Sequence, residues 1–90
     1  MKDKIKRLKS LVDTRYQDQG KRREILIYLS VCFLGFDGEN VARYFGMKYT
    51  RVRHHITVCG LKLQKSKYFM AKMHEIAKEY NVQQTLKLAV

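Results

Sequence analysis

The chain has 90 residues, enough for one small domain with a core that needs neither a metal ion nor a disulfide bond. Lys and Arg outnumber Asp and Glu by 19 to 8, and the net charge of +11 predicts a polyanionic partner. A hydrophobic share of 46% argues against global disorder, and the lack of proline favours an all-α fold: a compact bundle of about five helices in a single domain, residues 1–90.

The cysteines and the hydropathy of the sequence indicate the compartment in which the protein is expected to occur. Cys32 and Cys59 are far apart, neither belongs to a CxxC pair, and each lies in an apolar stretch with helical spacing. We therefore expect two buried thiols in a reducing compartment. The longest apolar run, residues 25–36, is too short to cross a bilayer, and the first residues do not resemble a signal peptide. These features favour a soluble, cytoplasmic protein without a membrane partner.

Residues 2–16 have the spacing of an amphipathic helix, with four aliphatic side chains between Ile5 and Val12 on one face and lysines on the other. A basic amphipathic helix can also lie on an anionic membrane. Here the apolar stripe is short, and no aromatic residue precedes Tyr16. We therefore expect this helix to pack within the domain.

The helical periodicity is lost over residues 14–23, which contain Gly20 and end in three consecutive basic residues. We predict a loop here. The cluster of Lys21, Arg22 and Arg23 has two possible roles. It is either a solvated helix entry or a contact to DNA phosphates or to the minor groove, whose negative potential attracts arginine.

Residues 24–36 are apolar on nearly every side, which is typical of a central helix that packs against several others. They carry no side chains suited to chemistry, so we assign them to the core. The next helix is expected over residues 38–45, with Asp37 as its N-cap and with Val41, Ala42 and Phe45 facing inward.

The second half of the chain predicts two further helices. The first starts near Tyr49, and Gly60 is expected to end or bend it. Ser66 is the expected N-cap of a last helix over residues 67–80, which leaves residues 81–90 weakly structured. The predicted buried stripes are Val52, Ile56, Cys59 and Leu63 on the first helix, and Phe69, Met73, Ile76, Ala77 and Tyr80 on the second.

Ala42, Gly46 and Val52 stand at the spacing A-x3-G-x5-V of the general helix-turn-helix signature. The signature has a physical basis, because the two helices cross closely at a small residue and the turn between them needs a glycine or its equivalent. We therefore predict a helix-turn-helix over about residues 38–59. His55 departs from the pattern, since that position usually holds an aliphatic residue.

One side of the second predicted helix is polar and basic, and residues 40–74 contain no Asp or Glu at all. Such a face can place Arg against guanine, Thr against a base edge, and His or Tyr against phosphate. A solvated surface helix is the alternative. The candidate major-groove residues are Lys48, Tyr49, Thr50, Arg51, Arg53, His54 and Thr57, and the candidate backbone or minor-groove residues are Lys21, Arg22, Arg23, Arg43 and Lys62.

Over residues 11–80, these motifs resemble the C-terminal DNA-binding domain (domain IV) of the bacterial chromosomal replication initiator DnaA. RREILIYLS is similar to the family's basic loop and the R-Q-x-A-M-x-L helix that follows it. VARYFGMKYTRVRHH is similar to the segment I-x-x-x-F-G-x-R-D-H-T-T-V-x-H-A. With one residue deleted in the turn, the matching positions are Phe45, Gly46, Thr50, Val52 and His54.

The resemblance implies a Trp-repressor-like helix-turn-helix domain that binds short boxes of double-stranded DNA. By position it implicates Arg22 or Arg23 in the minor groove, and Tyr49, Thr50, Arg51 and His54 in the major groove. The family's D-H-T-T is replaced by KYTR at residues 48–51, so a different DNA target is expected. The chain has no G-x-x-x-x-G-K-[ST] motif and therefore no ATPase site. A free-standing relative could be a phage or mobile-element protein, a regulator or a replication accessory, acting in replication initiation or transcriptional regulation.

Other functions remain open at this point. A helix-turn-helix can lose DNA binding and serve as a protein-protein interaction module, and an acidic partner such as a replication or regulatory protein would also explain the charge. RNA binding is less favoured, because no sheet with aromatic stacking platforms is expected. We expect neither catalysis nor a cofactor nor a metal site, since the adjacent His54 and His55 point about 100° apart on a helix. The oligomeric state is left unassigned.

Overall fold

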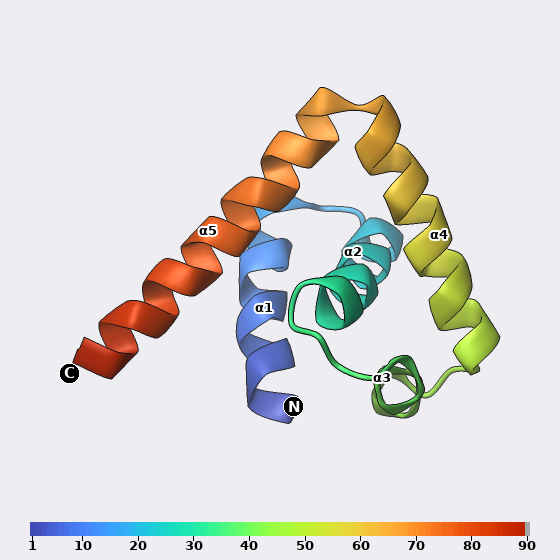
Figure 1. Ribbon diagram of the computed structural model, residues 1–90, viewed down its shortest axis with the longest axis horizontal. Helices are drawn as coiled ribbons and strands as arrows, with labels where there is room; N and C mark the ends of the chain where they lie inside the picture. Colours follow the sequence, from blue (N-terminus) through green and yellow to red (C-terminus); the bar gives the residue numbers. More distant parts are fainter. Residues whose placement is uncertain (90) are drawn as a thin grey trace.

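The computed structural model describes residues 1–89, with side chains through residue 83, and these residues form an all-α bundle without strands (Figure 1). The prediction of an all-α fold with about five helices is therefore confirmed for the described part of the chain. The helices are α1 (Lys2–Arg15), α2 (Gln19–Cys32), α3 (Gly38–Phe45), α4 (Tyr49–Lys65) and α5 (Lys67–Ala89).

Helix α2 is the centre of the bundle, as its all-round apolar sequence predicted. It contacts α1, α3 and α4, and in Figure 1 it lies between α1 on one side and α4 on the other. Its Ile25, Leu26 and Leu29 pack into one buried cluster, while Ile27 belongs to a second. Because α2 contributes to both clusters, the position of every other helix depends on it.

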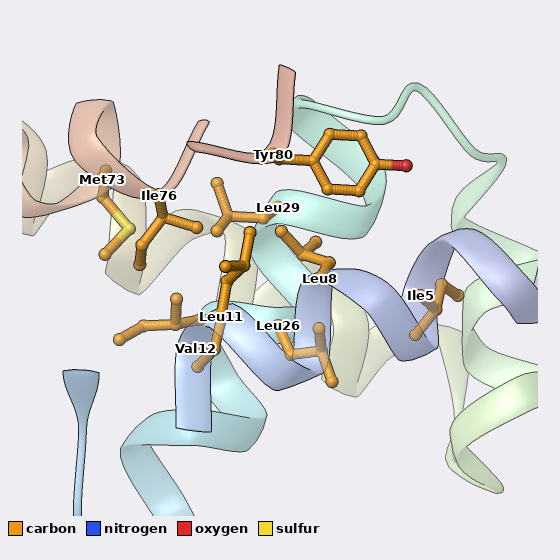
Figure 2. Packing of buried hydrophobic residues seen from close by; sticks show 10 residues of the cluster. Ile5, Leu8, Leu11, Val12, Leu26, Leu29, Met73, Ile76 and Tyr80 are labelled. Atoms are coloured by element: carbon orange, nitrogen blue, oxygen red, sulfur yellow. The ribbon is translucent and has the colours of Figure 1, made fainter. Parts of the chain in front are cut away.

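The larger cluster joins α1, α2 and α5 (Figure 2). Leu8 and Leu11 of α1 face Leu29 of α2, and Ile76 of α5 closes the cluster from the other side. The predicted buried stripes are confirmed at Met73, Ile76 and Tyr80 of α5, and at Val52 and Cys59 of α4.

The smaller cluster attaches the predicted helix-turn-helix to the rest of the domain. Ile27 of α2 packs against Val41 and Ala42 of α3 and against Val52 of α4, and all four side chains are buried. Burial of four aliphatic side chains between three helices fixes how α3 and α4 cross, because side chains in a close-packed core leave little freedom to shift.

Two boundary predictions near the basic cluster are wrong. The loop expected over residues 14–23 shrinks to the short link between Arg15 and Gln19, and the cluster of Lys21, Arg22 and Arg23 lies in α2. The Asp18 side chain accepts a hydrogen bond from the Lys21 backbone N–H at 3.1 Å, so an N-cap starts the helix before Gly20. Gly20 is therefore a helical residue and does not mark a loop.

Three further expectations are corrected towards the C-terminus and in the core. Gly60 neither ends nor interrupts α4, which continues to Lys65. Helix α5 continues to Ala89, so residues 81–89 are helical and not weakly structured, and no Gly or Pro interrupts this stretch. Cys32, the last residue of α2, is exposed and not buried as expected.

The two predicted caps differ in outcome. Ser66 is confirmed as the N-cap of α5, since its hydroxyl oxygen accepts a hydrogen bond from the Phe69 N–H at 3.1 Å. Asp37 occupies the N-cap position of α3, but its side chain makes no capping hydrogen bond. Among the described residues, no helix combines the length and the apolar character needed to span a membrane.

Candidate nucleic-acid interface

The turn between α3 and α4 has the geometry that the helix-turn-helix signature predicted. Gly46 ends α3 in the left-handed region, with φ of 65° and ψ of 40°. The N–H groups of Gly46 and Met47 donate to the carbonyls of Arg43 and Ala42 at 3.2 and 3.0 Å. Ala42 is 4% exposed and Val52 is fully buried, so the predicted register of the two helices is confirmed.

The polar face expected on the second helix is exposed in the structure. All seven candidate major-groove residues are exposed, namely Lys48, Tyr49, Thr50, Arg51, Arg53, His54 and Thr57. This confirms the assignment of inward and outward positions that followed from Val52.

The exposed residues divide into two groups. Lys48, Thr50, Arg51 and His54 line a concave surface between the start of α2, the end of α3 and the start of α4. We call this surface the basic groove. Its lining residues are Gly20, Arg23, Ala42, Arg43, Gly46, Met47, Lys48, Thr50, Arg51, His54 and His55.

The basic groove has a one-sided charge. Arg23, Arg43, Lys48 and Arg51 contribute positive groups, and none of the lining residues in the described part of the chain carries a carboxylate. Like charges gathered around a concave, partly desolvated surface reinforce one another's potential. The groove can therefore bind an elongated anion and can offer hydroxyl, imidazole and guanidinium groups as hydrogen-bonding partners.

The second group of exposed residues lies beside the groove. The Arg53 guanidinium carbon is 6.0 Å from the centre of the Tyr49 ring, an arrangement that allows a cation–π interaction. The Thr57 hydroxyl donates to the Arg53 carbonyl at 3.1 Å within the helix. Tyr49, Arg53 and Thr57 thus form an extension of the exposed face and do not line the concave surface.

The basic cluster at the start of α2 does not act as one unit. Arg22 turns away from the groove: its Nε donates to the Tyr16 carbonyl and lies 4.0 Å from the Asp13 carboxylate. Arg23 turns towards α3, where its Nη2 donates to the Phe45 carbonyl at 3.0 Å. Lys21 does not line the basic groove and instead lines a different cavity.

That second cavity has a volume of about 250 Å³ and holds both Lys21 and Lys62. The Lys62 Nζ lies 3.5 Å from Glu24 Oε1, and the Cys59 thiol donates to the same oxygen at 3.4 Å. Burial together with the nearby Glu24 carboxylate raises the pKa of Cys59 to about 12, so the thiol stays protonated. The structure therefore does not bring Lys21 and Lys62 together with the other candidate residues.

His55 is a groove residue that the sequence analysis did not include among the candidates. It is half-buried, and desolvation lowers the pKa of its imidazole, although the Glu24 carboxylate acts in the opposite direction. The signal was present in the sequence, because His55 was the one departure from the helix-turn-helix pattern.

Neither a possible metal site nor a comparison with known proteins adds a candidate functional residue. Among the described residues, no group of three His, Cys, Asp or Glu side chains is arranged to hold a metal ion. No protein-family model matches the chain, and neither a curated protein nor a solved structure matches it. The likeness to the DnaA domain therefore depends on the quoted residues alone.

Proposed function

We propose that this protein binds double-stranded DNA in a sequence-dependent way through the helix-turn-helix of α3 and α4. The observation that carries the proposal is the basic groove, in which positive side chains from two ends of the motif surround Thr50 and His54. The start of α4 is exposed on the same face, so it is free to enter a major groove.

Different groove residues are suited to different contacts. Arg43 and Lys48 lie at the end of α3 and just before α4, where they can neutralise phosphates on either side of an inserted helix. Arg51 can pair with guanine through two hydrogen bonds, and Thr50 can bond a base edge or contact a thymine methyl. Tyr49 and Arg53 extend the same face, so they are the next candidates for base or phosphate contacts.

The proposed biological role depends on the resemblance to the DnaA domain. A relative of the DnaA domain IV without an ATPase site would act in replication initiation or transcriptional regulation, in the cytoplasm of a bacterium or in a phage or mobile element. Tyr49 and Arg51 occupy positions where the family has other base-contacting residues. We therefore propose that the preferred DNA sequence differs from the one that the initiator binds.

Selection of bound duplexes from a random pool tests the proposal directly. We expect one retained sequence family, and its half-site symmetry would report the oligomeric state. If about five phosphates are neutralised, log K should fall with log salt at a slope of about −4 to −5. Combined replacement of Arg51 and Arg53 by Ala should abolish the preference, whereas Lys78→Ala on the exposed face of α5 is the matched control.

Two outcomes would contradict the proposal. One is unchanged DNA affinity in the Arg51 and Arg53 double variant, which would show that α4 is not the recognition helix. The other is the absence of any retained duplex at low salt. That result would favour the alternative use of the fold, as an interaction module for an acidic protein.

A further inference from the structure

Three consecutive residues at the start of α2 each contact a different helix. Arg22 contacts the end of α1, Arg23 contacts the end of α3, and Glu24 contacts α4. We call these three residues the α2 hub. All three side chains come from a single helical turn, so the hub ties the central helix to each of its neighbours by directional polar contacts.

The Arg23 contact supports the turn of the helix-turn-helix. The last carbonyls of an α-helix lack intrahelical partners. In α3, the Gly46 N–H donates a hydrogen bond to the Arg43 carbonyl, and the Met47 N–H donates one to the Ala42 carbonyl. The Phe45 carbonyl instead accepts from the Arg23 Nη2 at 3.0 Å. A guanidinium at this point also complements the negative end of the helix dipole. Arg23 therefore acts as a C-cap supplied by another helix.

The Glu24 contact holds α4 at a point well beyond the groove. The carboxylate accepts from the Cys59 thiol at 3.4 Å and pairs with Lys62 at 3.5 Å. The Glu24 side chain is 19% exposed and the Lys62 side chain is 45% exposed, so solvent partly screens the pair. Residues Cys59 and Lys62 lie in the second half of α4, whereas Arg23 contacts the end of α3, which leads through the turn into α4. The two contacts therefore hold opposite ends of the helix-turn-helix against α2.

The Arg22 contact completes the hub on the other side. Its Nε donates to the Tyr16 carbonyl, the residue that follows α1, and the Asp13 carboxylate lies 4.0 Å away. Arg22 and Arg23 were both candidates for a DNA backbone or minor-groove contact, and each side chain makes a hydrogen bond to a backbone carbonyl of this protein.

We propose that the α2 hub consists of positioning residues, which set the direction of α3 and α4 so that the groove residues keep the spacing that a base sequence requires. The inference rests on the proposed DNA binding for its functional readout. For Glu24 the two explanations predict opposite changes in DNA affinity. If only charge matters, removing a carboxylate close to a polyanion should strengthen binding. If Glu24 is a positioning residue, its loss should weaken binding to the preferred sequence.

The DNA arm of the experiment uses the full chain with its preferred duplex and a scrambled duplex. For Glu24→Gln we expect the ratio of the two affinities to fall by about fivefold, with no loss in affinity for the scrambled duplex. For Arg23→Gln we expect about tenfold weaker binding to the preferred duplex and a smaller change in the salt slope than for a cation that contacts phosphate, because the Phe45 carbonyl holds the Arg23 guanidinium. The control Lys48→Gln should reduce the magnitude of that slope by about 1, as expected for a lost phosphate contact.

The second arm is hydrogen exchange of the free protein, which does not depend on DNA. Arg23→Gln should speed exchange of the Gly46 and Met47 amide protons, while Lys78→Gln should not. If Arg23→Gln lowered the salt slope by about 1 and left these amides unchanged, Arg23 would be a phosphate contact and the inference would be overturned. If the wild-type chain bound no duplex, the proposed function would fail, and the exchange rates alone would decide the positioning role.

Discussion

Gly38 and Tyr49 are in direct contact across the helix-turn-helix: a Cβ atom on Gly38 would lie 2.6 Å from Cε1 of the Tyr49 ring. Gly38 is the first residue of α3, and Tyr49 is the first residue of α4. The ring is 43% exposed. The absence of a side chain on Gly38 thus allows the tyrosine to lie against α3 and not to project freely from the start of the second helix.

Gly38→Ala should therefore reorient Tyr49. The ring can rotate into solvent, so the free energy of unfolding should change by less than about 1 kcal/mol. The preferred DNA sequence should shift, because a candidate base reader has moved. A double-variant cycle with Tyr49→Ala checks the mechanism. Additive effects of the two substitutions on DNA affinity would show that the contact is irrelevant to recognition.

Gly46 and Gly60 should respond to alanine in opposite directions. Gly46 has a φ of 65°, so alanine there should cost about 1–2 kcal/mol although no atom lies within 4 Å of the added methyl group. Gly60 lies inside α4 and its methyl group would also meet open space, so alanine should stabilise the helix by about 0.5–1 kcal/mol. Urea unfolding of the two variants measures both changes, and equal effects would contradict the assigned backbone conformations.

The stability of the protein should fall as the pH is lowered through the ordinary pKa of histidine. Desolvation lowers the pKa of folded His55 below 6.5, so the unfolded chain binds a proton more readily and acid favours unfolding. The stabilisation is fully present above pH 6.5 and is lost below it. His55→Gln should flatten the dependence of unfolding free energy on pH between about 5 and 7. Lys78→Gln on the exposed face of α5 is the control, because it removes no imidazole.

The two thiols should differ sharply in their reaction with an alkylating reagent. Cys32 is exposed, although partial desolvation raises the pKa of its thiol, whereas Cys59 is buried and its pKa is raised to about 12 by burial and by Glu24. Because the thiolate is the nucleophile, the native protein should acquire one adduct, at Cys32, and a second only on unfolding. Mass spectrometry of a peptide digest identifies the site. Modification of Cys59 in the native Cys32→Ser variant would show that the α2–α4 interface opens.

The sequence by itself determined the parts of this protein that depend on neighbours along the chain. Helical spacing of apolar residues predicted the core faces of α1, α4 and α5, since a repeat of 3.6 residues places them on one side of a helix. The spacing of Ala42, Gly46 and Val52 predicted the turn and its register, because a left-handed glycine and a close helix crossing are local requirements.

Only the tertiary structure decided which polar groups meet. Arg22 and Arg23 are neighbours with the same charge, yet they contact different helices, because their side chains leave α2 about 100° apart. The pairing of Glu24 with Cys59 and Lys62 joins residues far apart in the chain, and no periodicity encodes it. Such contacts arise when hydrophobic packing brings α2 and α4 together, and they separate the residues that line the groove from those that hold it in place.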